Sequence, residues 1–90
     1  MKRLLLACLL VVAIATTAAA QTCVVNDPTG TPLNVRTSPN GVILGALYNG
    51  AVVQVLKVIF DKRGRSWALV VPLGPGKQGW VFGAFLTCGR

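Results

Sequence analysis

The sequence predicts an all-β fold, a small barrel of five to six short strands preceded by a cleaved signal peptide. The 90 residues leave room for one small domain. Beyond residue 20, short runs rich in β-branched residues alternate with turn signals roughly 8–12 residues apart, as in small barrels and sandwiches. No window shows the period of about 3.6 residues that marks an amphipathic helix.

The first twenty residues are typical of a secretory signal peptide. Met1-Lys2-Arg3 is a positive start, Leu4–Ala15 is an apolar run, and Ala18-Ala19-Ala20 offers a small-residue cleavage site. We therefore expect residues 1–20 to be removed and the mature chain to begin at Gln21. Two alternatives remain open, an uncleaved membrane anchor and a lipoprotein that uses Cys8.

The first half of the expected domain carries three strands separated by dense turn segments. Val24-Val25 leads into the turn residues Asn26–Pro32. Leu33–Arg36 alternates apolar and polar side chains, which predicts a half-buried strand whose Leu33 and Val35 face the core. After the turn Thr37–Gly41, the apolar run Val42–Tyr48 forms the next strand.

The longest strand is expected in the middle of the domain. Asn49-Gly50 is a strong tight-turn dipeptide, and the unbroken, β-branched-rich run Ala51–Phe60 follows it. Asp61–Ser66 is then a charged loop with a central glycine.

Two further strands and one short turn complete the barrel. Trp67–Leu73 is the next strand, with Pro72 at its edge or end because proline cannot donate to a sheet. Gly74-Pro75-Gly76 turns the chain, and Gln78–Phe82 returns as a strand in which we expect Trp80 to be largely buried. Gly83–Leu86 forms one short turn.

Two cysteines remain once the signal peptide is removed, Cys23 and Cys88. Export places them in an oxidising compartment, and their even number favours a disulfide between them. Their spacing is far from that of a C-x-x-C redox pair. The chain-entropy treatment gives such a long closed loop about 4 kcal/mol of stabilisation.

The composition excludes most catalysis. The chain has no His and no Glu, so it lacks Ser-His and Cys-His pairs and any histidine metal site. Asp27 and Asp61 are the only carboxylate side chains, and the cations around Asp61 should keep it ionised. We therefore expect a protein that is not an enzyme and uses no cofactor or metal.

Six motifs in order resemble the bacterial SH3 (SH3b) family. The chain has L-N-V-R-T-S-P at Leu33–Pro39, then V-I-L-G-A-L, N-G-A-V-V-Q-V, W-A-L-V, G-W-V and a closing Phe85-Leu86. The resemblance covers about Leu33–Leu86 and implies an SH3-like barrel over residues 21–90. It also implies a small exported protein consisting of this one domain.

A positive surface suggests an anionic partner. Without the signal peptide the chain holds seven Lys and Arg against two Asp, a formal +5, partly gathered in the Asp61–Ser66 loop. The residues that we consider as ligand contacts are Arg36, Tyr48, Lys62, Arg63, Arg65 and Trp67. Asn34 is expected instead to hydrogen-bond nearby backbone.

These features predict a non-catalytic binding module of the cell envelope, periplasmic or secreted. It would recognise cell-wall peptide of peptidoglycan or an envelope protein through its barrel loops. The alternative is a structural subunit or modulator of an envelope enzyme or complex. Export argues against nucleic acid as a partner, and no stable membrane anchor is expected after cleavage.

Overall fold

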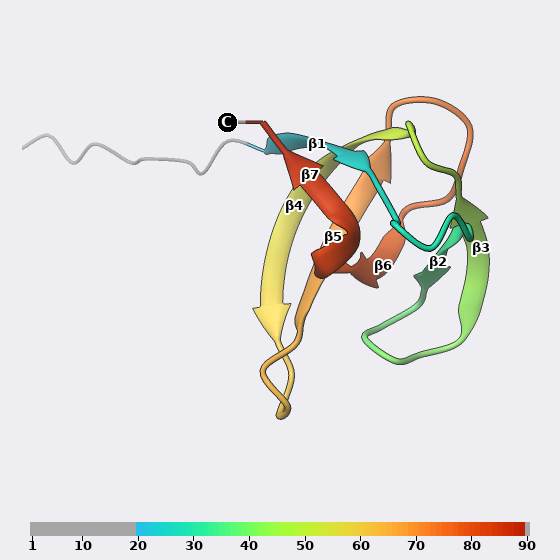
Figure 1. Ribbon diagram of the computed structural model, residues 1–90. Coiled ribbons are helices and arrows are strands. Elements are labelled where there is room, and N and C mark those ends of the chain that lie inside the picture. Colours follow the sequence, from blue (N-terminus) through green and yellow to red (C-terminus); the bar gives the residue numbers. More distant parts are fainter. Residues whose placement is uncertain (1–19, 90) are drawn as a thin grey trace, which may run out of the picture.

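A computed structural model describes residues 20–89 as seven strands and one short 3-10 helix (Figure 1). The elements are β1 (Gln21–Val25), β2 (Leu33–Arg36), β3 (Ile43–Leu47), β4 (Val52–Phe60), β5 (Ser66–Pro72), β6 (Gly79–Phe82), η2 (Gly83–Phe85) and β7 (Leu86–Cys88). The predicted all-β class is confirmed. The predicted signal peptide lies outside the described residues except for Ala20, and β1 begins directly after it, at Gln21.

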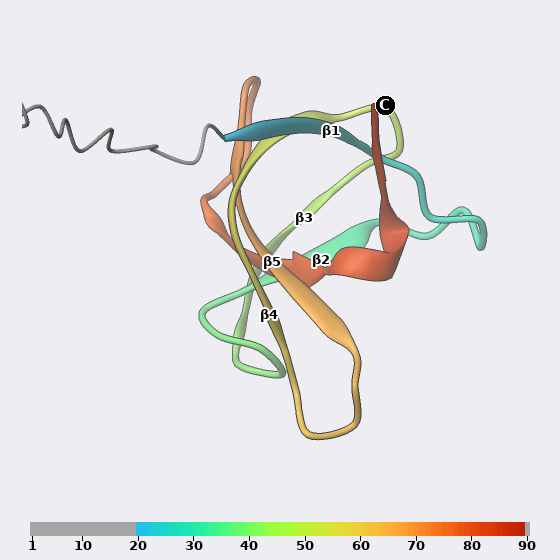
Figure 2. The ribbon, with the colours of Figure 1, turned by 90° about the vertical axis from the view of Figure 1, so that its left-hand side faces the viewer.

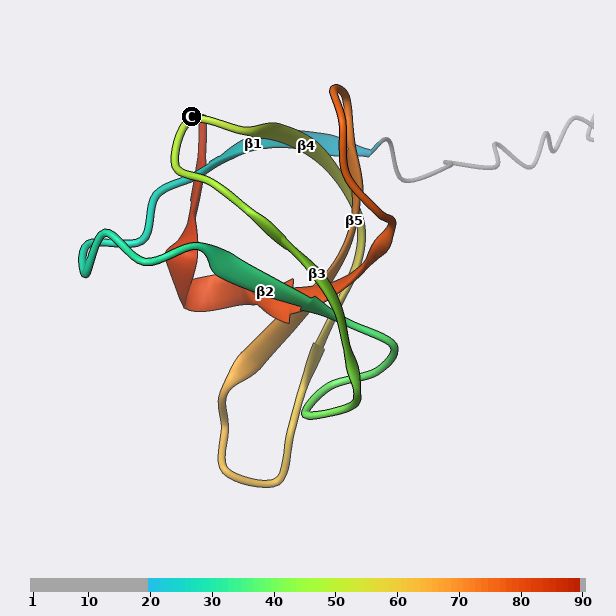
Figure 3. The same ribbon diagram turned by 90° about the vertical axis from the view of Figure 1, so that its right-hand side faces the viewer.

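The seven strands form a single antiparallel sheet in the order β3-β2-β6-β5-β4-β1-β7. Figure 3 shows that the sheet curls around on itself. Within residues 20–89 no ladder joins the outer strands β3 and β7, so the barrel is partly open. The strand beyond the five or six expected is β7, which follows the predicted short turn at Gly83–Phe85.

The core consists mainly of valines at alternate strand positions. Val25, Val35, Val53, Val70 and Val81 are fully buried and come from five different strands. Successive strand residues point to opposite faces, so each buried valine has neighbours turned away from the core. Burial of these β-branched side chains drives the curling of the sheet and fixes its register.

β4 is the longest strand, as predicted, and it changes neighbours along its length. Its first half pairs with β1 through Val52–Val55 and with β5. A register shift follows Val55, and from Lys57 to Phe60 the strand pairs with β5 and with no other described strand. The far end of the β4–β5 hairpin therefore extends beyond the rest of the barrel (Figure 2). Pro72 ends β5, also as predicted.

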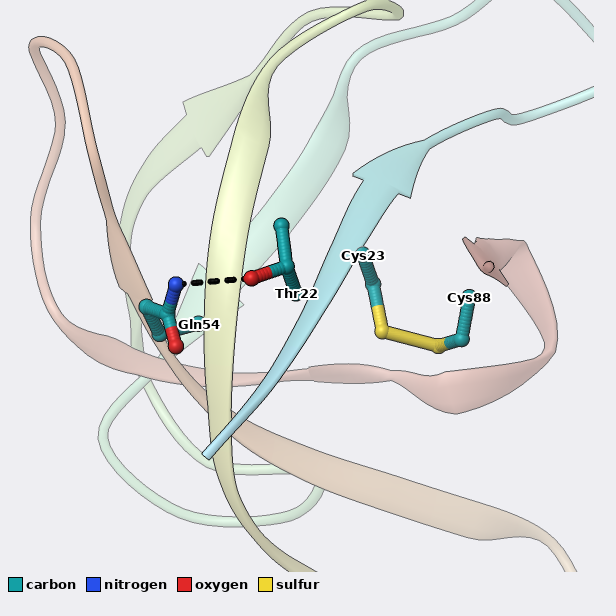
Figure 4. The surroundings of a disulfide bond; sticks show 4 residues. All are labelled: Thr22, Cys23, Gln54 and Cys88. Carbon is teal, nitrogen blue, oxygen red and sulfur yellow. Dashed lines mark hydrogen bonds between the residues drawn. A yellow bond between two sulfur atoms is a disulfide. The ribbon is translucent and has the colours of Figure 1, made fainter. Parts of the chain in front are cut away.

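The predicted Cys23–Cys88 disulfide is present (Figure 4). The two cysteines are register partners on the neighbouring strands β1 and β7, with their Cα atoms 4.1 Å apart. On the other side of β1, Gln54 of β4 donates a hydrogen bond from Nε2 to Oγ1 of Thr22 at 2.8 Å. The disulfide thus joins β7, the last strand of the chain, to β1, the first strand of the chain.

Candidate functional site

One face of the sheet, turned away from the valine core, gathers aromatic and basic side chains. Register pairs Arg36 of β2 with Trp80 of β6, and Trp80 with Leu69 of β5. Trp67 and Phe82 are likewise paired. Opposite residues of an antiparallel pair point to the same side, so these five side chains share one face across three strands.

Two aromatic rings of this face, Trp67 and Phe82, form a cluster with Phe85 through edge-to-face contacts. The ring centroids of Trp67 and Phe82 lie 5.4 Å apart, and those of Phe82 and Phe85 also lie 5.4 Å apart. Both pairs have the T-shaped geometry that aromatic rings favour. Phe82 and Phe85 also pack against the core, so the cluster is a rigid platform joined to the barrel interior.

An open groove of about 350 Å³ lies over this platform. Its apolar lining comes from the aromatic cluster and two neighbours, and its polar lining from four segments of the chain. The lining residues are Asp27, Thr31, Pro32, Leu33, Asn34, Arg36, Asn40, Arg65, Trp67, Phe82 and Phe85. A second hollow, lined in part by Arg36, Leu44, Leu69 and Trp80, shares Arg36 with the groove.

Two arginines line the groove, and each is held by one hydrogen bond. Arg36 donates from Nη1 to the carbonyl oxygen of Gly41 at 2.9 Å. Arg65 donates from Nε to Oδ2 of Asp61 at 2.8 Å. The remaining N–H groups of both guanidinium groups have no hydrogen-bond partner among the described residues. These positioned donors are suited to a carboxylate or another planar anion.

Asp61 holds Arg65 and the charged loop in place. Its Oδ1 accepts the backbone N–H groups of Arg63 and Arg65, and its Oδ2 accepts Nε1–H of Trp67 at 3.0 Å. These bonds, above all the one from the Trp67 indole, hold the pKa of Asp61 far below its ordinary value. The prediction that Asp61 stays ionised agrees with this direction, but the leading cause is the indole rather than the surrounding cations.

Asp27 is the other carboxylate, and it is 4% exposed at one end of the groove. Oδ1 accepts the hydroxyl and the N–H of Thr29 at 2.6 and 2.8 Å, and Oδ2 accepts the hydroxyl of Thr31. These bonds, led by the Thr29 hydroxyl, lower the pKa of Asp27. Asn49 then clamps the Asp27 backbone, accepting its N–H at 2.7 Å and donating to its carbonyl oxygen.

The structure brings three of the six candidate residues together. Arg36, Arg65 and Trp67 line the groove. Tyr48 follows β3 as an exposed side chain and lines neither hollow, and Lys62 and Arg63 are at the tip of the β4–β5 hairpin.

The two tryptophans differ in burial. Trp67, a candidate ligand contact, is 4% exposed and lines the groove. Trp80, which we expected to be largely buried, is half-buried and lines the second hollow. The reason is strand alternation: Gly79 and Val81 face the core, so Trp80 faces away from it.

Several groove residues were not among the candidates. Asn34, expected to bond nearby backbone, makes no side-chain hydrogen bond to a described residue and lines the groove instead. Asn40, Phe82 and Phe85 were missed as well. The signal that could have found Phe82 is the same alternation, which places it on the face of Trp80.

Metal and membrane features are limited in the described part of the chain. Residues 20–89 hold no group of three or more His, Cys, Asp or Glu that could bind a metal ion. They also hold no helix with the length and apolar character needed to cross a membrane.

Comparison with protein-family models, curated proteins and solved structures found no match to this chain.

Proposed function

We propose that this chain is a non-catalytic binding module of the cell envelope that holds an anionic peptide in the groove. The observation that carries the proposal is the placement of Arg36 and Arg65 in one groove above an aromatic floor. Guanidinium groups bind carboxylates through paired N–H donors, and aromatic rings offer apolar contact to the rest of a peptide. Peptidoglycan stem peptides and acidic segments of envelope proteins both have this chemistry.

An exported, periplasmic or secreted location fits the covalent structure and the sequence. Disulfides persist in oxidising compartments, and Cys23–Cys88 joins the neighbouring strands β1 and β7 at one edge of the sheet. The signal-peptide pattern of residues 1–20 supports the same location. The SH3b-like motifs support a binding role, because the resemblance is to a family that commonly accompanies cell-wall enzymes.

The state of the carboxylates also supports a role without catalysis. A general acid or base works best with a pKa near the working pH. Asp27 and Asp61 instead have lowered pKa values, because Asp27 accepts bonds mainly from Thr29 and Asp61 accepts bonds from the Trp67 indole and from Arg65. Both carboxylates therefore hold the chain beside the groove in place by accepting backbone N–H groups.

The test is cosedimentation of the purified protein with purified peptidoglycan and its soluble stem peptides. We expect Arg36→Gln to lower the affinity about tenfold and salt to weaken binding of the wild type. Lys77→Gln is the matched control, because Lys77 is exposed and lies outside the groove. Binding by Arg36→Gln that equals the wild type, with Lys77→Gln affected instead, would reject the groove as the site.

A structural subunit or modulator of an envelope complex is a second candidate, favoured by strand β3. Among residues 20–89, β3 pairs only with β2 and has no partner on its other edge, and Val42, Ile43 and Leu44 beside this edge are exposed. Such an edge can accept a strand of another protein. Copurification from envelope extracts that is lost in Ile43→Lys, but kept in Arg36→Gln, would favour this role.

A further inference from the structure

The tip of the β4–β5 hairpin has features that the groove does not use. Within the described part of the chain, β5 is the only sheet neighbour of β4 beyond Val55, and the hairpin projects from the barrel (Figures 2 and 3). Neither hollow is lined by residues 56–60, nor by Lys62 or Arg63. The tip is therefore a convex surface that stands apart from the proposed binding groove.

The projecting strand exposes apolar side chains at alternate positions. Leu56 is 50% exposed, Val58 is 52% exposed and Phe60 is 70% exposed. Single exposed apolar residues are ordinary on protein surfaces. Val58 and Phe60 alternate after the register shift and so lie on one face of the strand, and Leu56 is exposed at the shift itself. Three exposed apolar residues within the last five of one projecting strand form a local apolar surface, and larger surfaces of this kind usually mark interaction sites.

Cations surround these apolar side chains. Lys62 and Arg63 are exposed in the turn next to Phe60, and Lys57 is exposed within the strand. The only acidic residue of the hairpin is Asp61, whose carboxylate is bonded to Arg65 and to the Trp67 indole. Four cations and one anion give residues 56–66 a formal charge of +3.

We propose that this tip docks on an anionic lipid surface. A projecting apolar tip with flanking cations matches a bilayer interface, where Phe and Leu side chains enter the boundary between headgroups and acyl chains and each Lys or Arg near an anionic surface adds about 1 kcal/mol. Phe60, Val58 and Leu56 enter the interface, while Lys62 and Arg63 contact lipid phosphates. Such docking is reversible and holds the groove near the membrane without a transmembrane segment.

The test uses the protein purified in its naturally processed form, so that every variant has the same N-terminus. Cosedimentation is measured with vesicles of equimolar phosphatidylglycerol and phosphatidylcholine, and with vesicles of phosphatidylcholine alone. We expect binding to the anionic vesicles and little to the neutral ones. Lys62→Ala with Arg63→Ala should lower the partition coefficient about 30-fold, and Phe60→Ala should lower it about tenfold.

Matched controls come from other exposed positions. Tyr48 is 71% exposed, close to the value for Phe60, and lies outside the hairpin, so Tyr48→Ala should bind vesicles as the wild type does. Arg36→Gln should also bind them normally, which separates this proposal from the groove. Thermal unfolding of each variant checks that the fold is kept, as expected for exposed positions.

Three results would overturn the proposal. The first is a wild-type protein that ignores anionic vesicles. The second is a loss of binding that is as large for Tyr48→Ala as for Phe60→Ala. The third is self-association of the wild type that Phe60→Ala abolishes while vesicle binding stays unchanged, since this would assign the tip to a second copy of the chain.

Discussion

Two turns of this molecule share the same internal chemistry but differ in what holds them. Asp27-Pro28-Thr29-Gly30 and Asp61-Lys62-Arg63-Gly64 each begin with aspartate and end with a glycine at positive φ, +80° and +78°. In both, the glycine N–H donates to the aspartate carbonyl oxygen at 3.0 Å. In both, Oδ1 of the aspartate accepts the N–H of the third residue. Aspartate at the first position and glycine at the fourth are the preferred residues of a type I turn.

The surroundings of the two turns are opposite in kind. The Asp61 turn closes the hairpin of β4 and β5, which are paired from its base onward, and Asp61 N–H donates to the Arg65 carbonyl oxygen at 3.0 Å. The Asp27 turn links β1 to β2, which are not neighbours in the sheet. It is held instead by Asn49 and by β1, which the disulfide fastens. Local sequence forms both turns, but only distant residues place the first one at the groove.

Removing the disulfide should have the largest effect on the stability difference between the two turns. Replacing Cys23 and Cys88 together with serine opens a loop with a sequence separation of 65, and the loss should be about 4 kcal/mol. β1 and the Asp27 turn should loosen first, while the β4–β5 hairpin keeps its amide protection. Urea unfolding and hydrogen exchange measure both effects. Equal loss of protection in the two turns would show that they do not differ in anchoring.

A smaller loss of stability is expected when the hydrogen bond from Trp67 to the Asp61 turn is removed. Trp67→Phe removes the Nε1–H bond to Asp61 and part of a buried ring, and should cost about 2 kcal/mol at neutral pH. Because the pKa of Asp61 is lowered in the fold, its contribution is present above about pH 3.9 and is lost as the pH falls further. The difference between variant and wild type should therefore shrink below about pH 4.

Trp80→Phe is the control for this pH effect. Trp80 is half-buried and has no side-chain hydrogen bond to a described residue. Its replacement should therefore cost the same at pH 7, about three units above the ordinary aspartate pKa, and at pH 3, about one unit below it. Stability is measured by urea unfolding at each pH. A Trp67→Phe deficit that does not change with pH would assign the loss to packing alone.

The same comparison explains which parts the sequence predicts. Strand alternation and turn residues are local, so the strands, the Asp61 loop and the end of β5 at Pro72 are predicted well. The groove is assembled from β2, β5, β6 and the Asp27 turn, and sheet order decides that assembly. No local pattern gives the order β2-β6-β5, so the pairing of Arg36 with Trp80 and the place of Arg36 in the groove beside Phe82 could not be predicted.

For the basic loop, closeness in sequence suggested a single site that the structure does not have. Lys62, Arg63 and Arg65 are close in sequence and were grouped as one candidate site. The hairpin separates them, because Asp61 draws Arg65 back to the groove while the turn carries Lys62 and Arg63 to the tip. One cluster of cations in the sequence is therefore divided between two surfaces, the groove and the tip of the hairpin.

Removing the Asn49 side chain, which holds the Asp27 backbone, should cause an intermediate loss of stability. Asn49→Ala leaves the N–H and carbonyl oxygen of Asp27 without their side-chain partner, and the cost should be about 1–2 kcal/mol. The Asp61 turn should not respond. Asn34→Ala is the matched control and should stay within about 0.5 kcal/mol of the wild type. Thermal unfolding gives the stabilities, and a cost for Asn49→Ala no greater than the control would contradict the anchoring role.

The smallest expected effect sharpens the comparison, because it tests what the two turns share. Gly30→Ala and Gly64→Ala each force alanine into a left-handed conformation, yet an added Cβ meets no atom within 4 Å at either position. The penalty is then purely conformational, about 1 kcal/mol, and should be equal in the two variants. Unfolding in urea measures both. If Gly30→Ala costs clearly more, the distant anchors transmit strain into the Asp27 turn; equal costs show that its internal chemistry is independent of them.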